Sequence, residues 1–389
     1  MPNIDLAETG PDFYADPHPH YRALRESAGI QQRTTRLGEP FWLVLGYDDA
    51  RAFLSDSRLS KSRVSGGHQQ VIGQHLLDSD PPVHTRLRKL VVREFTRRRV
   101  ENLRPRVEET TAGLLDDMVP RGRADLVDSL GFPLPMGVLC ELLGIPAEDR
   151  VLFKEWTRDI LAPRDPKAKP LASTALIAYL TDLIEQKRRG QPSDDLMHAL
   201  LRTSTEDNDR LSPDELCAMI FILILAGHET TTNLLSTGTY ALLRHPGQLA
   251  ALRADPALID GAVEEMLRFD SSVESGTTRY ATEKIEYGDV VIEPGEMVLV
   301  SLASADRDPG TFERPDEFDI RRPPGPGHLA FGHGIHFCLG APLARMQARI
   351  ALNALVQRCP GLTLDREPEP SDWLGGIQVR GLQQLFVRW

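Results

Sequence analysis

Hydrophobic side chains recur three or four positions apart along much of the 389-residue chain, a spacing that places them on one face of an α-helix. This pattern predicts helices over residues 100–119, 173–189, 260–269 and 341–359. A further helix is predicted to begin at Ser212-Pro213-Asp214-Glu215, which combines a capping box with proline in the first turn, and to end near Arg244. Helical spacing therefore dominates the chain.

Strand-like segments are short and lie in two regions of the chain. They cover residues 41–47, residues 289–302 with a Pro-Gly turn in the middle, and residues 385–389. No stretch has the composition of a linker, and no repeat of 20–50 residues is present. We expect one domain over residues 1–389, mainly α with small β-sheets at its edge.

Composition and charge narrow the class of protein. The net charge of −11 argues against a nucleic-acid or anionic-membrane binder. The longest apolar run, residues 216–227, is shorter than the ~20 residues that a membrane-spanning helix needs. The first residues carry no export signal, and the four cysteines lack close pairing. We therefore expect reduced thiols in a cytoplasmic protein. We also expect the protein to be a monomer.

Cys338 stands apart from the other cysteines because it lies where a loop rich in glycine and histidine runs into a helix. The zinc spacing C-x₂-C and the covalent haem motif C-x-x-C-H are both absent here. Gly332 and Gly334 permit positive φ, and the helix that starts after Gly340 points N–H groups toward the thiol, which should lower its pKa. A thiolate in such a loop suits an axial ligand of haem iron. A nucleophilic cysteine near His336 and a buried structural cysteine are the alternatives.

The stretch Phe331–Gly340 has the pattern F-G-x-G-x-H-x-C-x-G and resembles the haem-binding loop of the cytochrome P-450 family. The resemblance extends from "DPHPHYRALRE" through "DPPVHTRLRKLV" and "VEEMLR" to the end of the chain, and is greatest to soluble bacterial members that oxidise macrolides and related polyketides. It implies the cytochrome P-450 fold and haem b with Cys338 as the iron ligand. The loop residues implied to contact the haem are Phe331, Gly332, His336 and Gly340.

The long predicted helix carries "AGHETTT" in its middle, where an acid and three threonines interrupt an apolar face. Such residues are unfavourable there unless they serve a site or face water. The resemblance implies that Ala226 leaves room for the haem. It also assigns Glu229 and Thr230 to proton delivery while O₂ is activated. His228 is expected to be a satisfied structural histidine.

Haem carries two propionates that need cationic or hydrogen-bonding partners. His84 and Arg88 are four residues apart and would share one helix face. The resemblance assigns propionate contacts to this pair, to Arg279 and to His336. A structural cluster is implied for Glu265, Arg268 and Arg322, with Arg321 as the neighbouring alternative to Arg322.

Residues 86–106 hold nine basic residues and two acids in an otherwise acidic chain. Most charge runs are solvated faces, but this one also suits docking of an acidic redox partner. Because the chain has no G-x-G-x-x-G nucleotide motif, its electrons must come from outside. We expect NAD(P)H to supply them through a ferredoxin and a ferredoxin reductase.

The resemblance implies a haem-thiolate monooxygenase that hydroxylates or epoxidises a bulky apolar natural product, with a macrolide or related polyketide favoured. The segments implied to line the substrate pocket are 61–77, 161–174, 271–279 and 374–379. Steroid, terpenoid and peptide substrates stay open. The other classes considered are a haem sensor or carrier without turnover and a peroxide-using oxygenase, both of which could dispense with the Glu229–Thr230 pair.

Overall fold

The computed structural model describes residues 13–35, 38–62, 75–93, 95–161, 165, 167–206, 211–374 and 378–389. Helices make up most of the fold, and the sheets are small, as the periodicity predicts. The α-helices are α1 (His18–Ser27), α2 (Tyr47–Ser55), α3 (Val83–Val92), α4 (Arg97–Asn102), α5 (Arg104–Met118), α6 (Pro133–Leu143), α7 (Arg150–Leu161), α8 (Ala168–Arg189), α9 (Leu196–Glu206), α10 (Pro213–Arg244), α11 (Pro246–Ala254), α12 (Ile259–Phe269), α13 (Leu302–Ala305) and α14 (Ala341–Arg358).

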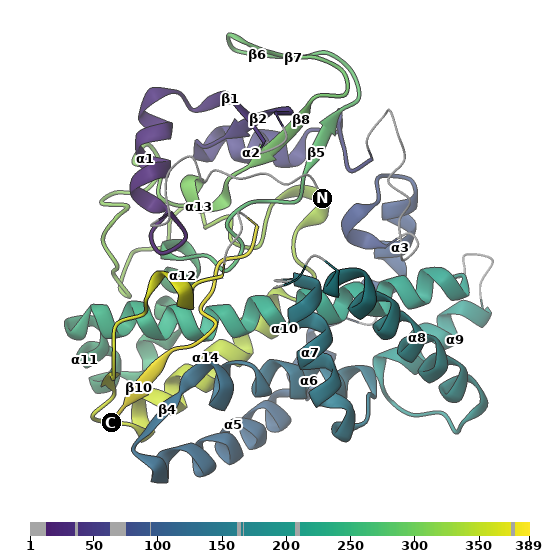
Figure 1. The fold of residues 1–389 in the computed structure, drawn as a ribbon, viewed down its shortest axis with the longest axis vertical. Helices are drawn as coiled ribbons and strands as arrows, with labels where there is room; N and C mark the ends of the chain where they lie inside the picture. The colour runs from purple at the N-terminus through teal and green to yellow at the C-terminus, as the bar shows by residue number, and fades with distance from the viewer. Residues whose placement is uncertain are drawn as a thin grey trace.

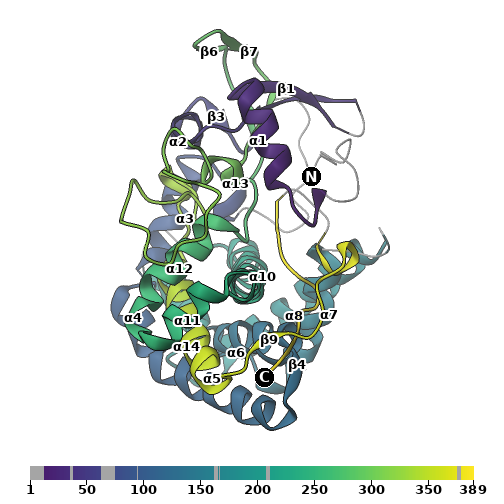
Figure 2. The same ribbon diagram turned by 90° about the vertical axis from the view of Figure 1, so that its left-hand side faces the viewer.

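Helix α10 runs through the middle of the molecule, and Figure 2 looks nearly along it, with α6, α12 and α14 around it. Its start is the predicted one: the Ser212 side chain accepts from the Glu215 N–H, and the Glu215 side chain accepts from the Ser212 N–H. By length and composition α10 could cross a membrane, but 67% of its most apolar 18-residue window is buried inside the protein. A helix apolar on most sides is stable in water only when other elements cover it.

The single helix predicted over residues 100–119 is wrong, because the structure divides it into α4 and α5 at Leu103. Pro105 lies in the first turn of α5. Proline lacks the N–H that a continuing helix would use, and its ring collides with the preceding turn. The break could therefore have been read from Pro105.

Five strands form the largest sheet, in the order β1 (Ile30–Thr34), β2 (Pro40–Val44), β8 (Met297–Val300), β5 (Arg279–Ala281) and β3 (Leu59–Ser60). Only β2 and β8 pair in parallel. The predicted segment 289–302 divides between two sheets, since β7 (Val290–Ile292) pairs with β6 (Ile285–Tyr287) while β8 joins the larger sheet. The third sheet contains β4 (Arg123–Asp125), β10 (Phe386–Arg388) and β9 (Thr363–Leu364).

Most of the helices lie in one part of the molecule, while the five-stranded sheet lies in another together with α1, α2 and α13 (Figure 1). Separate buried clusters of hydrophobic side chains occupy the two parts. Arg380, near the C-terminus, ties the two ends of the chain together. Its guanidinium donates to the carbonyls of Tyr14 and Ala15 at 2.7 and 2.9 Å, and to Asp270 at 2.5 Å. The Cys338 loop follows the sheet region and leads into α14, which packs on α10.

Candidate active site

The loop around Cys338 closes on itself through main-chain hydrogen bonds. The Cys338 N–H donates to the Phe331 carbonyl at 2.9 Å, and the Gly332 N–H donates to the Leu329 carbonyl at 2.7 Å. Gly332 and Gly334 both have φ of 72°, the left-handed conformation expected of them. Helix α14 then begins at Ala341, so its free N–H groups lie next to the thiol.

The expectation that this loop lowers the pKa of Cys338 is wrong for the polypeptide alone. Burial is the largest influence and raises the pKa of the thiol. The N–H groups of Gly340 and Ala341, together with the nearby charges of Arg88 and Arg345, lower it by a smaller amount. Burial penalises the anion, and sequence spacing cannot report how deeply a sulfur is buried. A thiolate here therefore needs a further positive partner, such as a metal ion.

Helix α3 brings His84 and Arg88 to this loop. The His84 ring lies 4.3 Å from the His336 ring, measured between centroids, and Arg88 donates to the Phe337 carbonyl at 2.7 Å. His84 is 2% exposed, and its Nε2 has no hydrogen-bond partner in the described part of the chain. Burial and the surrounding positive charges lower the pKa of His336 to about 3, so this imidazole is neutral.

Arg279, at the start of β5, is 4% exposed and donates to the Thr277 carbonyl at 3.1 Å. Lys61 lies beside it, and its Nζ donates to the hydroxyl of Thr277. Burial and the Arg279 charge lower the pKa of Lys61 to about 7. The sequence analysis placed Lys61 in a segment implied to line the substrate pocket. It did not predict that Lys61 lies beside Arg279, because that contact depends on how β3 and β5 pair.

These groups form what we call the cation cluster: Lys61, His84, Arg88, Arg279 and His336. Each of Lys61, His84, Arg88 and Arg279 acts electrostatically on His336 and lowers its pKa. Within the described ranges no carboxylate forms an ion pair with any of the five. The charges of Asp78 and Asp80 act on the cluster without a direct ion pair. The charges of Lys61, Arg88 and Arg279 outnumber these two acids, so the cluster fits a group that carries carboxylates of its own, as haem does.

The Glu229–Thr230 pair lies in the middle of α10. Thr230 Oγ1 donates to the Ala226 carbonyl at 2.9 Å, and Ala226 itself is exposed. Burial raises the pKa of the Glu229 carboxyl, and the nearby Asn233 side chain lowers it by a smaller amount. The pair is not in hydrogen-bond contact with Cys338 in the part of the chain that the structure describes. A protonatable carboxyl beside a hydroxyl is a suitable arrangement for proton transfer.

Two residues lie between Ala226 and this pair. Gly227 packs against α6, since a Cβ there would lie 3.4 Å from the methyl groups of Leu139. His228 is only half satisfied: Nδ1 contacts the Ile224 carbonyl at 2.7 Å, but Nε2 has no hydrogen-bond partner among the described residues. The nearest acid to Nε2 is Glu229, at 3.7 Å.

The structure brings Arg322, and not Arg321, to the buried carboxylate of Glu265. Arg322 Nε lies 3.0 and 3.2 Å from the two oxygens, and Arg268 donates to both at 2.8 Å. Arg268 also donates to the carbonyls of Asp306 and Pro315 at 2.9 Å. The cluster therefore joins α12 to the chain that precedes the Cys338 loop.

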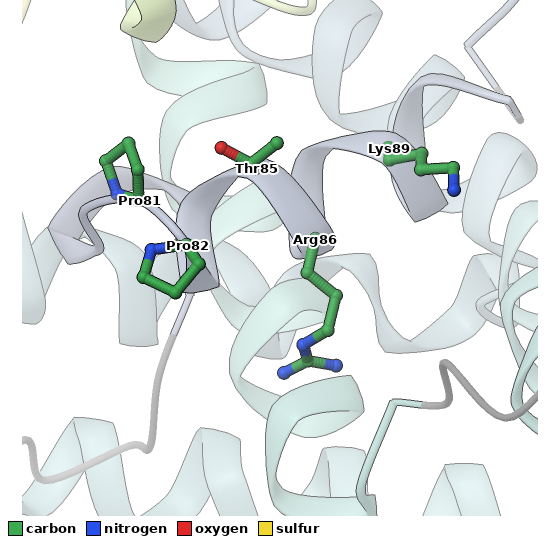
Figure 3. Close-up of a pocket in the computed structure, with 5 residues that line it drawn as sticks. All are labelled: Pro81, Pro82, Thr85, Arg86 and Lys89. Carbon is green, nitrogen blue, oxygen red and sulfur yellow. The ribbon is translucent and has the colours of Figure 1, made fainter.

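The basic segment 86–106 is partly neutralised by acids. Arg86 pairs with Glu215, and Arg99 lies 3.1 Å from Asp194. Arg97 and Arg98 are exposed and form no ion pair within the described ranges. A pocket lies beside α3 (Figure 3). Its lining residues are Pro81, Pro82, Thr85, Arg86 and Lys89. None of the residues predicted to bind haem lines that pocket.

Parts of the segments implied to contact substrate lie outside the described residues, namely 63–74, 162–164, 166 and 375–377. The segment 271–279 is described. Val273 forms an isolated bridge with Val379, which brings two of the implied segments together.

Comparison with known proteins supports one family. A family model described as cytochrome P450 matches residues 151–379. The chain is 52% identical to cytochrome P450 monooxygenase PikC of Streptomyces venezuelae, over 100% of this chain and 94% of that protein. It is 43% identical to 6-deoxyerythronolide B hydroxylase of Saccharopolyspora erythraea, over 97% of this chain and 96% of that protein.

A solved structure of the bacillaene polyketide synthase cytochrome P450 PksS of Bacillus subtilis 168 matches with a TM-score of 0.91 and 38% identity, over 97% of this chain and 98% of that one. The fold, the cysteine loop and these matches agree. The chain belongs to the cytochrome P450 family, and it is a haem-iron monooxygenase.

Proposed function

We propose that Cys338 Sγ is the axial ligand of the haem iron and that the cation cluster binds the two propionates. The observation that carries this proposal is the position of Cys338: a thiol beside two main-chain N–H donors and the charges of Arg88 and Arg345, in the loop whose His336 borders the rest of the cation cluster. His84 Nε2, which has no hydrogen-bond partner among the described residues, and the buried guanidinium of Arg279 supply donors for carboxylates. Phe331, Gly332 and Gly340 shape the loop around the sulfur.

The bound haem would supply the capacity to activate O₂ and insert one oxygen atom into a C–H or C=C bond. The polypeptide would supply the proton path. The raised pKa of Glu229 leaves more of its carboxyl protonated near neutral pH than is usual for glutamate, so it can donate. The Thr230 hydroxyl, which the Ala226 carbonyl orients, would carry the proton onward.

We propose that the substrate is a macrolide or a related polyketide. The names of the relatives support this class, since one hydroxylates 6-deoxyerythronolide B and PksS belongs to a polyketide synthase system. A ferredoxin and its reductase would deliver electrons from NAD(P)H to the face that carries Arg97 and Arg98. We propose that the chain functions as one domain, as a monomer, in the cytoplasm.

The iron ligand can be tested with the carbon monoxide spectrum of the reduced protein. Wild-type protein should show the absorption of a thiolate-ligated haem, and Cys338→Ser should lose it. Cys359→Ser removes a free thiol that is buried away from the loop and serves as the control, which should keep the wild-type spectrum. A wild-type spectrum like that of a histidine-ligated globin would overturn the assignment.

The substrate class can be tested by measuring product formation with surrogate ferredoxin and reductase on a panel of macrolactones, linear polyketides, steroids and terpenoids. We expect NAD(P)H-dependent oxidation of a macrolactone. Turnover of a steroid alone would move the substrate to another class. Haem reduction without turnover of any compound would favour a sensor, and turnover with hydrogen peroxide alone would favour a peroxide-using oxygenase.

A further inference from the structure

A charged cluster joins α12, α14 and the segment that opens the Cys338 loop; it is separate from the cation cluster and reaches the site through the charge of Arg345, which acts on Cys338. Glu264 accepts two parallel hydrogen bonds from Arg345, with Nε to Oε1 and Nη2 to Oε2 both at 2.7 Å. His328 Nε2 lies 3.1 Å from the same Oε2. We call Glu264, His328 and Arg345 the Glu264 cluster. A bidentate pair of this kind fixes the orientation of the guanidinium as well as its position.

The protonation of the cluster follows from its hydrogen bonds. The Ala330 N–H donates to His328 Nδ1 at 3.2 Å, so Nδ1 is the acceptor and Nε2 carries the proton that bonds Glu264. Hydrogen bonds from His328 and Arg345 outweigh burial and lower the pKa of Glu264 to about 2. One ionised carboxylate therefore holds both the segment that opens the loop and the helix that follows it.

The cluster reaches the thiol through Phe331. The Arg345 guanidinium carbon lies 4.5 Å from the centroid of the Phe331 ring, and the His328 ring packs near that ring at 5.8 Å. The Phe331 carbonyl in turn accepts the Cys338 N–H. The Arg345 charge also acts directly on the Cys338 sulfur. Glu264 therefore influences both the shape of the loop and the positive charge beside the sulfur.

We infer that Glu264 is a positioning residue for the thiolate, because it holds Arg345 on the Phe331 ring and His328 at the start of the loop. The inference rests on the proposed function, in which Cys338 is the iron ligand. It predicts that Glu264 stabilises the iron–sulfur bond and also lowers the reduction potential, since it neutralises the charge that Arg345 places near the sulfur.

The test compares Glu264→Gln with the wild type as haem-loaded protein. The variant keeps the side-chain shape but loses the charge and one of the two strong acceptors. We expect its ferrous carbon monoxide complex to convert from the thiolate to the non-thiolate spectrum about tenfold faster, the factor expected for loss of one charge-assisted hydrogen bond. Its midpoint reduction potential should rise. Neither readout depends on turnover.

Asp116→Asn is the matched control, because Asp116 also pairs with an arginine of α14, Arg358 at 2.6 Å, at the opposite end of that helix from Arg345. It should leave the conversion rate within about twofold of wild type. Glu264→Asp, which retains the charge, should recover part of the loss. Arg345→Lys, which keeps both charges but not the fork, should raise the conversion rate as Glu264→Gln does and leave the midpoint potential near that of the wild type.

Wild-type conversion rate and potential in Glu264→Gln would overturn the inference, as would an equal change in Asp116→Asn. If Glu264→Gln loads too little haem, Arg345→Lys decides by the conversion rate, and a wild-type rate in that variant would overturn the inference. A wild type without a thiolate spectrum would be a separate result, because it overturns the proposed iron ligand itself.

Discussion

Thr230 and Glu229 are adjacent in sequence but lie in different environments on α10. The Thr230 hydroxyl is held by the carbonyl one turn back, at 2.9 Å, while the Glu229 carboxyl is 19% exposed and has a raised pKa. A helix tolerates a threonine bonded back in this way, and Thr239 makes the same bond to Leu235 at 2.7 Å. The two threonines therefore share their local structure, and Thr230 differs in having the Glu229 carboxyl next to it in the chain.

Thr230→Ala should retain haem and substrate binding but lose the hydroxyl that passes protons. We expect the fraction of NAD(P)H consumption that yields product to fall at least about tenfold, with hydrogen peroxide formed in its place. Parallel assays of NAD(P)H, product and peroxide measure this, with Thr239→Ala as the control. Unchanged coupling in Thr230→Ala would remove the hydroxyl from the mechanism.

At the scale of elements, α12 organises the chain around the cysteine loop with two successive glutamates. Glu265 is 3% exposed and holds Arg268 and Arg322, and these arginines bond carbonyls between residues 306 and 317. Glu264 instead accepts from Arg345, whose guanidinium lies next to the Cys338 loop. Neighbouring positions on one helix point in different directions, so the two carboxylates bind different segments.

Arg322→Ala should destabilise the protein by about 3–5 kcal/mol, because it leaves the buried Glu265 carboxylate with one partner fewer. Arg321→Ala should change the free energy of unfolding by less than about 0.5 kcal/mol, since Arg321 is exposed and makes no bond to Glu265. Denaturant unfolding followed by circular dichroism measures both. Equal effects of the two substitutions would contradict the assignment of Arg322.

At the scale of the whole molecule, one segment is basic although the net charge is negative. The chain carries −11 overall, yet residues 86–106 concentrate nine basic residues, and one of these, Arg88, donates to the Cys338 loop. Ile335 and Phe337 of that loop are 51% and 42% exposed, so apolar side chains lie at the surface next to Arg88. This combination suits transient docking of an acidic protein.

Changing Arg97 and Arg98 together to glutamine should slow haem reduction by ferredoxin about tenfold at low ionic strength, because these exposed charges steer association. The difference from wild type should shrink as salt is added. Stopped-flow reduction across a salt series measures it. Lys167→Gln with Lys169→Gln removes equal charge from the start of α8 and should have little effect; an equal effect there would show only a dependence on net charge.

The sequence by itself determined the features that depend on neighbours along the chain. The start of α10 follows from the Ser212–Glu215 capping box, the positive φ of Gly332 and Gly334 follows from the lack of a side chain, and the loop pattern identifies the family. Even the break at Leu103 was encoded locally, by Pro105.

Tertiary structure alone decided what depends on burial and on contacts between distant segments. It selected Arg322 over Arg321, placed Lys61 in the cation cluster through the pairing of β3 with β5, and packed Gly227 against Leu139. It also showed that burial raises the pKa of Cys338, where the sequence predicted a lowered pKa. The physical reason is common to all four: desolvation and long-range contacts depend on which segments surround a residue, and spacing along the chain does not contain that information.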